Sequence, residues 1–325
     1  MKTITKLALV AISIFAIACS KSNTDENPVA PVPDNSLLLT KTERVVTSPI
    51  RNLTGYWWCT KLDSGDKFVF HNNDNSNSSA ERGMMFYDLA TNTFIDKTKC
   101  SGVAAVGAPN RLLTDGLGGL WYIAGTFNKY NATLGVWEAS AAGSTIFPNS
   151  IALSSASTGS ITVPSKGRLY YISGFGVKYF DTTNNTWNFA ADYPLNMVRY
   201  PSLATDNDNK IYAIGGFTGA GINYKKLYYL NIQSNSWTEL AEAPELNGNS
   251  AALNTMVFFK NHLVYLGADK KLYVYDIATN KWQNTSFDTD VYSVNDTHLE
   301  LSTDGTKIYL IYKKSNSAIG IQEYK

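Results

Sequence analysis

The sequence predicts an all-β fold of six four-stranded sheets, arranged as the blades of a propeller. Two series of short motifs predict it, each repeated about every 50 residues along the chain. A period of this length is typical of propellers and solenoids. No helical period of comparable strength accompanies the motifs in the region that follows the N-terminal apolar run. Seven blades are the alternative, if the N-terminal region holds a further degenerate unit.

The first series is an aromatic hairpin motif. A large apolar residue is followed at once by Asp or Asn, and a Trp or Phe stands seven positions after the start. Its copies are YDLATNTF from Tyr87, YNATLGVW from Tyr130, FDTTNNTW from Phe180, LNIQSNSW from Leu230 and YDIATNKW from Tyr275. We expect each to join the third and fourth strands of a blade, with the Asp or Asn bonding the backbone ahead of it. The flanking rings can then pack between neighbouring sheets. In the last copy, Tyr275 should end the third strand and Trp282 should begin the fourth.

The second series consists of short aromatic and β-branched runs, each preceded by a tight-turn signal. This composition predicts a buried second strand in each blade, with a short first strand before the turn. The six copies are KFVF from Lys67, GLWYIAG from Gly119, RLYYISG from Arg168, KIYAIGG from Lys210, HLVYLGA from His262 and KIYLIYK from Lys307.

Six second strands and five hairpin motifs leave one blade incomplete. Residues 320–325 (GIQEYK) supply a third strand for the last blade, and the chain then stops. Residues 37–49 (LLLTKTERVVTSP) have strand character and precede the first complete blade. An unpaired sheet edge is unfavourable, so we expect this N-terminal segment to complete the last blade.

The N-terminus has the pattern of a secretory signal. Lys2 and Lys6 precede a twelve-residue apolar run over residues 7–18, which is too short to span a bilayer. The residues Ala16-Ile17-Ala18-Cys19 resemble the lipobox of bacterial lipoproteins, although most lipoboxes have Leu where Ala16 stands. The resemblance implies cleavage before Cys19 and lipidation of its thiol. The alternative is ordinary signal cleavage nearby, with Cys19 an unused thiol.

Three segments follow from this pattern: a signal peptide over residues 1–18, a disordered polar tether over 19–36, and the propeller over 37–325. The expected location is the bacterial cell envelope, as an outer-membrane lipoprotein on the periplasmic or cell-surface side. Ser20 favours the outer membrane, because Asp after the lipidated Cys often signals inner-membrane retention in lipoproteins. We expect contact with the membrane through the lipid anchor alone.

The glycines after the second strands, taken with the aromatic hairpins, resemble the kelch repeat. Kelch blades carry a glycine pair at that place, and Gly215-Gly216 match it fully. One glycine is present at Gly125, Gly174 and Gly267, and the first and sixth units have none. The resemblance covers nearly all of the region after the tether. It implies a propeller and says little about function.

The net charge argues against one class of partner, and the cysteine content leaves a disulfide open. The net charge is +1 with 17% charged residues, which argues against a nucleic-acid partner because that would need a basic stripe. Besides Cys19, the chain has Cys59 and Cys100. An even pair in an oxidising compartment permits a disulfide, but two buried thiols are equally ordinary.

We expect a binding site on the face that carries the connections from second to third strands and from blade to blade. These connections are long and varied, and variable loops on a rigid scaffold commonly bind ligands. Arginine and exposed aromatic side chains there would suit a sugar or a carboxylate. The alternative for each residue is an ordinary solvated or packed side chain. The candidates are Arg111, Phe127, Arg199, Tyr200, Tyr224 and His298.

The sequence favours binding over catalysis. The only histidines, His71, His262 and His298, fall in three different blades, so a shared copper site of the galactose-oxidase type is not expected. No nucleophile elbow or zinc signature occurs. We therefore expect no catalytic residue, no metal and no cofactor, and a lipid-anchored propeller that engages a glycan or an envelope protein. The alternative is a carbohydrate-active enzyme similar to a kelch-type sialic-acid epimerase, using Glu81, Glu245 or Arg199.

Overall fold

The structure is a computed structural model. The chain divides into two units, residues 1–35 and residues 36–325. It describes residues 36–47, 56–62, 67–73, 83–99, 111–123, 127–134, 136–139, 159–173, 176–195, 201–216, 224–245, 255–291, 299–315 and 318–325. The expected signal peptide and the tether before Ser36 lie outside these ranges. No helix within them is long and apolar enough to cross a bilayer.

Antiparallel strands form six four-stranded sheets, which we number as blades 1 to 6. Blades 1 and 2 consist of β2 (Tyr56–Lys61), β3 (Lys67–Asn73), β4 (Gly83–Asp88) and β5 (Thr93–Lys99), then β6 (Arg111–Thr114), β7 (Leu120–Ile123), β8 (Phe127–Asn131) and β9 (Val136–Ala139). Blades 3 and 4 consist of β10 (Gly159–Val163), β11 (Arg168–Ser173), β12 (Gly176–Asp181) and β13 (Thr186–Ala191), then β14 (Ser202–Thr205), β15 (Lys210–Ile214), β16 (Leu227–Asn231) and β17 (Ser236–Glu239). Blade 5 consists of β18 (Met256–Phe259), β19 (His262–Leu266), β20 (Lys271–Asp276) and β21 (Lys281–Asp288). Blade 6 consists of β22 (Leu299–Thr303), β23 (Ile308–Ser315), β24 (Ala318–Tyr324) and β1 (Lys41–Thr47). We call the strands of each blade A to D in this order.

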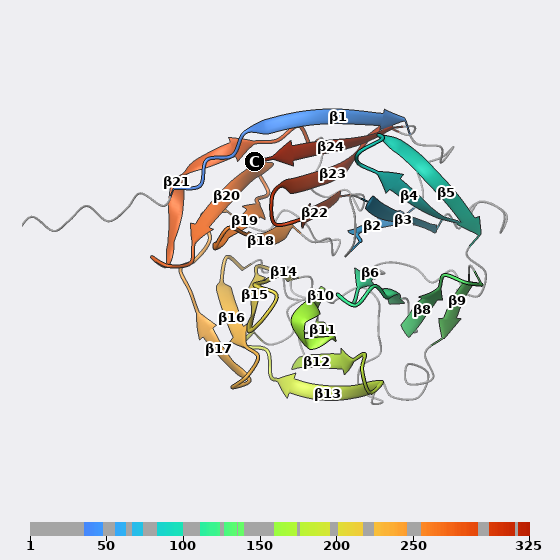
Figure 1. Ribbon diagram of the computed structural model, residues 1–325. Helices are drawn as coiled ribbons and strands as arrows, with labels where there is room; N and C mark the ends of the chain where they lie inside the picture. Colours follow the sequence, from blue (N-terminus) through green and yellow to red (C-terminus); the bar gives the residue numbers. More distant parts are fainter. Residues whose placement is uncertain are drawn as a thin grey trace, which may run out of the picture. The chain divides into compact units, whose positions relative to one another are not determined.

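The six blades form a closed ring. Each innermost strand A lies beside the strand A of both neighbouring blades, in the circular order β2, β6, β10, β14, β18, β22 and back to β2. Figure 1 shows these strands around the centre, with strands B to D farther out. The prediction of six blades is therefore confirmed, and the alternative of seven is wrong for residues 36–325 as described.

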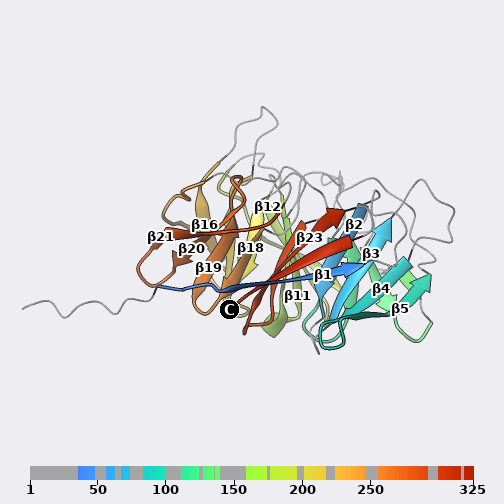
Figure 2. The same ribbon diagram turned by 90° about the horizontal axis from the view of Figure 1, so that it is seen from above.

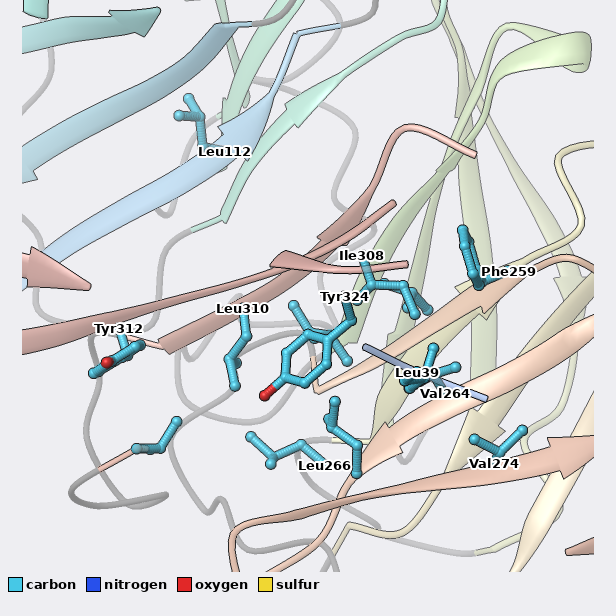
Figure 3. Close-up of a cluster of buried hydrophobic side chains, with 14 of the residues drawn as sticks. Leu39, Leu112, Phe259, Val264, Leu266, Val274, Ile308, Leu310, Tyr312 and Tyr324 are labelled. Carbon is cyan, nitrogen blue, oxygen red and sulfur yellow. The ribbon is translucent and has the colours of Figure 1, made fainter. Parts of the chain in front are cut away.

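Blade 6 is completed from both ends of the chain, as the sequence predicts. β1 pairs antiparallel with β24 from Lys41 opposite Tyr324 to Thr47 opposite Ala318. Figures 1 and 2 show the blue β1 along the dark red β24. Just before β1, Leu39 is buried in an apolar cluster that includes Val264 and Tyr324 (Figure 3). The N-terminal segment thus contributes both a strand and core packing.

The hairpin motif behaves as expected. Tyr275 and Trp282 are cross-strand partners whose ring centroids lie 5.2 Å apart. β20 and β21 extend one residue farther into the turn than predicted, to Asp276 and from Lys281. In all five copies the Asp or Asn after the first residue accepts backbone N–H groups of the turn; these residues are Asp88, Asn131, Asp181, Asn231 and Asp276.

Positive φ angles explain two further features of the repeat, the glycine pair and an asparagine in the hairpin. Gly215 and Gly216 have φ of 68° and 90°, a region that favours glycine, which accounts for the glycine pair. The hairpins of four blades contain an asparagine with φ between 52° and 57°, namely Asn92, Asn185, Asn235 and Asn280. Asparagine tolerates this left-handed conformation better than most residues.

Candidate functional site

A cavity of about 610 Å³ lies in the central channel, at the end where strands A turn into strands B. All six blades contribute the end of strand A to its lining. Because the strands alternate in direction, the A–B and C–D turns share one face of the ring, and the B–C and blade-to-blade connections share the other. The cavity therefore lies on the face opposite to the one for which the sequence predicted binding.

Six lining residues occupy equivalent positions, one from each blade. Each pairs with the first apolar residue of its strand B, such as Thr205 with Ile211 and Lys61 with Phe68. Four blades have threonine at this position, and the other two have lysine and phenylalanine. We call this set the channel ring; it comprises Lys61, Thr114, Thr162, Thr205, Phe258 and Thr303.

Threonine suits this position because its hydroxyl can close the A–B turn. Thr205 Oγ1 donates to the carbonyl of Lys210 at 2.9 Å and accepts the N–H of Asn207 at 3.0 Å. Thr303 makes the same pair of bonds in blade 6, to the Lys307 carbonyl at 2.7 Å and from the Gly305 N–H at 3.0 Å. Such side-chain bonds satisfy backbone groups that the tight turn would otherwise leave to water.

An aspartate follows the ring threonine in three blades and also closes the turn. Oδ1 of Asp115 and of Asp206 accepts two and three backbone N–H groups respectively. Asp304 accepts from the Tyr309 hydroxyl at 2.6 Å and from both the backbone and the hydroxyl of Thr306 at 2.8 Å. Burial alone would raise the pKa of Asp304, but these hydrogen bonds outweigh it and lower the pKa below its ordinary value. This carboxylate is held ionised.

The two exceptions in the channel ring have different surroundings. In blade 5 the turn consists of Lys260 and Asn261, both with positive φ (48° and 61°). A two-residue turn of this kind is closed by its backbone geometry and needs no side-chain bond. Phe258 instead stacks on Tyr212 of blade 4, with 6.3 Å between the ring centroids. In blade 1, Lys61 Nζ lies 3.5 Å from the carbonyl of Leu62, which is a long contact for a hydrogen bond.

The predicted site residues are not brought together by the described part of the structure. Arg111 begins β6 and Phe127 begins β8, and the structure describes only their backbones. Tyr224 packs against the buried cluster shared by blades 3 and 4. The other three candidates, Arg199, Tyr200 and His298, lie outside the described residues. Binding on that face stays a prediction.

Other predicted features can be placed only in part. Cys59 is buried in β2, and Cys100 lies outside the described residues, so their disulfide is also untested. His262 Nδ1 lies 2.7 Å from the carbonyl of Lys260 within the blade 5 turn. Glu245 is half-buried, and Glu81 is outside the described ranges. In the part of the chain that is described, no three His, Cys, Asp or Glu side chains gather as a metal site would require.

Comparison with known proteins agrees with this architecture. The kelch motif matches residues 200–244, which span blade 4 and its glycine pair. The described chain is a six-bladed β-propeller with a kelch motif in blade 4. The solved structure of YjhT superposes on this propeller with a TM-score of 0.56 at 11% identity, covering 82% of this chain and 94% of YjhT. At that identity the likeness shows the fold alone. No curated protein matches the chain.

Proposed function

We propose that this kelch propeller is a lipid-anchored, non-catalytic binding protein of the bacterial envelope, which holds a glycan or a partner protein. The lipobox-like residues before Cys19 and the polar segment after it support the anchor. The propeller supports binding, since a closed ring presents a rigid channel to a ligand.

The state of Asp304, the carboxylate among the described lining residues of the cavity, is the observation that carries the proposal of a non-catalytic role. Proton transfer needs a group whose pKa lies near the working pH and whose oxygen can reach the substrate. Asp304 lines the cavity, but its oxygens accept hydrogen bonds from its turn and from Tyr309 of β23, and its pKa is lowered. The hydroxyl, amide and apolar groups around it suit recognition of a ligand rather than acid–base chemistry.

The attachment point agrees with a binding role. The tether would enter the propeller through residues 36–40, directly before β1, which is the outermost strand of blade 6. Sixteen residues, 20–35, separate Cys19 from the described chain, and fully extended they reach about 55 Å. The chain would thus join the tether at the outermost strand of a blade and not at a strand A that lines the channel.

Two measurements test the proposal. Metabolic labelling with a fatty acid should mark the wild-type protein and fix it to membranes, whereas Cys19→Ser should remain unlabelled. An unlabelled wild type would remove the anchor from the proposal. In the second measurement, the protein lacking residues 1–19 is applied to a glycan array, and each bound glycan is recovered and examined by mass spectrometry and NMR.

The array separates the possible functions. An unchanged bound glycan supports a binding protein. A glycan recovered isomerised or cleaved would support the carbohydrate-active enzyme instead. If no glycan binds, the partner is expected to be an envelope protein, and cross-linking in cells followed by purification through the propeller should then recover one partner in stoichiometric amount. Failure of both measurements would contradict the binding function.

A further inference from the structure

Residues 36–47 connect the ring to the segment that precedes it, and we call them the closing segment. We propose that tension on the N-terminal anchor releases the closing segment from blade 6 reversibly, before any blade unfolds. The proposal rests on the proposed anchor at Cys19, because a chain without an anchor carries no tension. It assigns these residues a mechanical role besides closure of the ring.

The closing segment is the first part of the propeller that such tension reaches. It follows the tether directly along the chain, and β1 is its strand. β1 is outermost in blade 6 and pairs with β24 (Figure 1). In blades 1 to 5 the outermost strand instead follows strand C of its own blade through a hairpin. Tension on the anchor therefore reaches those strands only through β1 and then β2.

The contacts that hold the closing segment lie in order along the chain, so tension meets them one after another. The first buried side chain is Leu39, 8% exposed, in the apolar cluster with Val264 and Tyr324 (Figure 3). The two backbone bonds between Thr40 and Lys325 come next. A tether that leaves the rim at an angle to β1 loads this end first, and a strand pulled from one end gives up its pairs in sequence.

The ion pairs of β1 follow. Lys41 Nζ lies 2.9 Å from Asp290 Oδ2, but both side chains are partly exposed, so this pair adds little. Arg44 holds more firmly, because it bonds the Leu89 carbonyl at 2.7 Å and pairs with the largely buried Glu323. All of these contacts are non-covalent, and each can form again.

Release would not separate the closing segment from the protein. Its C-terminal end continues along the chain to β2, strand A of blade 1, so β1 remains attached next to the ring. A strand attached in this way rebinds as an intramolecular event at high effective concentration. The free edge of β24 and the apolar surface uncovered by Leu39 also favour rebinding. The ring should therefore close again when the tension falls.

Optical tweezers test the proposal on the protein from residue 19 onward. One handle is attached to residue 19 and the other to Gln233, an exposed side chain in the C–D hairpin of blade 4. As the force rises, one extension step should precede unfolding of the ring. The step should reverse when the force is lowered.

A disulfide across the closure provides a sharp comparison. Thr40 and Lys325 are exposed and form a hydrogen-bonded antiparallel pair. Cα atoms in such pairs lie about 5.5 Å apart, which suits a disulfide. Thr40→Cys combined with Lys325→Cys should lose most of the extension step when oxidised and regain it when reduced. The wild type, measured under both conditions, controls for Cys59 and Cys100.

Two neighbouring leucines provide a matched pair of variants. Leu39 is 8% exposed and Leu38 is 73% exposed. At constant force, Leu39→Ala should shorten the lifetime of the closed state at least roughly tenfold, because the variant loses apolar burial and leaves a cavity. Leu38→Ala should behave like the wild type.

Three results would overturn the proposal. These are rupture of the ring in a single event, an extension step unchanged by the oxidised disulfide, or equal lifetimes for Leu38→Ala and Leu39→Ala. Each would leave the proposed binding function standing. A wild-type protein that fatty acid does not label would instead remove the anchor, and with it the tension on the closing segment.

Discussion

The backbones of Thr40 and Lys325 exchange two hydrogen bonds, one in each direction, at 3.0 and 3.2 Å. They join the residue before the first described strand to the last residue of the chain. Seven residue pairs between β1 and β24 continue this contact. The ring is therefore closed by a strand pairing between its two ends and not by a covalent link.

Removal of the closing strand should strongly destabilise the propeller. A protein beginning at residue 48 loses the β1 pairing and the buried side chains of Leu39 and Val46. Burial of two such side chains contributes roughly 3–6 kcal/mol, so the melting temperature should fall by on the order of 10 °C. Calorimetry compares the melting temperature of this shortened protein with that of a protein beginning at residue 36. The latter keeps β1 and should melt like the full chain. Equal melting temperatures for the two would refute closure by β1.

Arg44 links the closing strand to blade 1. Its guanidinium donates to the carbonyl of Leu89 at 2.7 Å and forms an ion pair with the largely buried Glu323. Arg44→Met should destabilise the protein by about 2–4 kcal/mol, because it leaves much of a buried charge uncompensated. Lys307, 3.0 Å from Glu323, limits the loss. Urea unfolding should show that adding Glu323→Gln to Arg44→Met recovers part of the lost free energy of unfolding. If the double variant instead loses the sum of the two single effects, Arg44 and Glu323 are not coupled.

The fold was predictable because its determinants recur in the sequence. The pair of Tyr275 and Trp282, its copies in the other blades and the unpaired edge of blade 6 each have a local physical cause that a reader of the sequence can recognise. The bounds of the hairpin strands were one residue short, because the pairing of Asp276 with Lys281 carries no strand signal in its composition.

The hairpin asparagine provides a further test. Asn280 has φ of 55°, and its Oδ1 accepts the Tyr275 hydroxyl and, at 3.0 Å, the N–H of Ala241 in the preceding blade. Asn280→Ala loses both bonds and strains the backbone, at a cost of about 3 kcal/mol. Asn280→Gly keeps the conformation, so it should be about 1 kcal/mol less destabilising, and Asn280→Asp should be the mildest. Chemical denaturation ranks the three, and an alanine variant as stable as the glycine variant would show that the conformation is not the cause.

The candidate cavity was harder to predict than the fold. The alignment of Lys61 with Thr205 and Thr303 depends on strand register, which the sequence alone left open because the turn of blade 1 lacks the Thr-Asp pair. Loop length directed the prediction to the other face, whereas the channel ring is built from short and regular turns. A search for Thr-Asp before each second strand would have shown three blades in register.

Asp304 should make stability depend on pH. Its folded-state pKa lies below the ordinary value of 3.8, so its contribution to stability is present above that pH and is lost as the pH falls through the folded pKa. Asp304→Asn should be destabilised by about 1–2 kcal/mol at pH 7, because it weakens the bond from Tyr309. The difference from wild type should shrink below pH 4 in urea titrations. Asp208→Asn, at an exposed acid on the same face, should change stability by less than about 0.5 kcal/mol. A difference that stays constant between pH 7 and pH 3 would contradict this role.

Thr303 should stabilise the protein through the A–B turn of blade 6. Its hydroxyl donates to the Lys307 carbonyl at 2.7 Å and accepts the Gly305 N–H at 3.0 Å. Thr303→Lys should lower the free energy of unfolding by about 0.5–1 kcal/mol, because a lysine ammonium has no acceptor for the Gly305 N–H. Thermal unfolding of the variant and the wild type measures the difference. A variant as stable as the wild type would show that the threonine hydroxyl adds nothing to the turn.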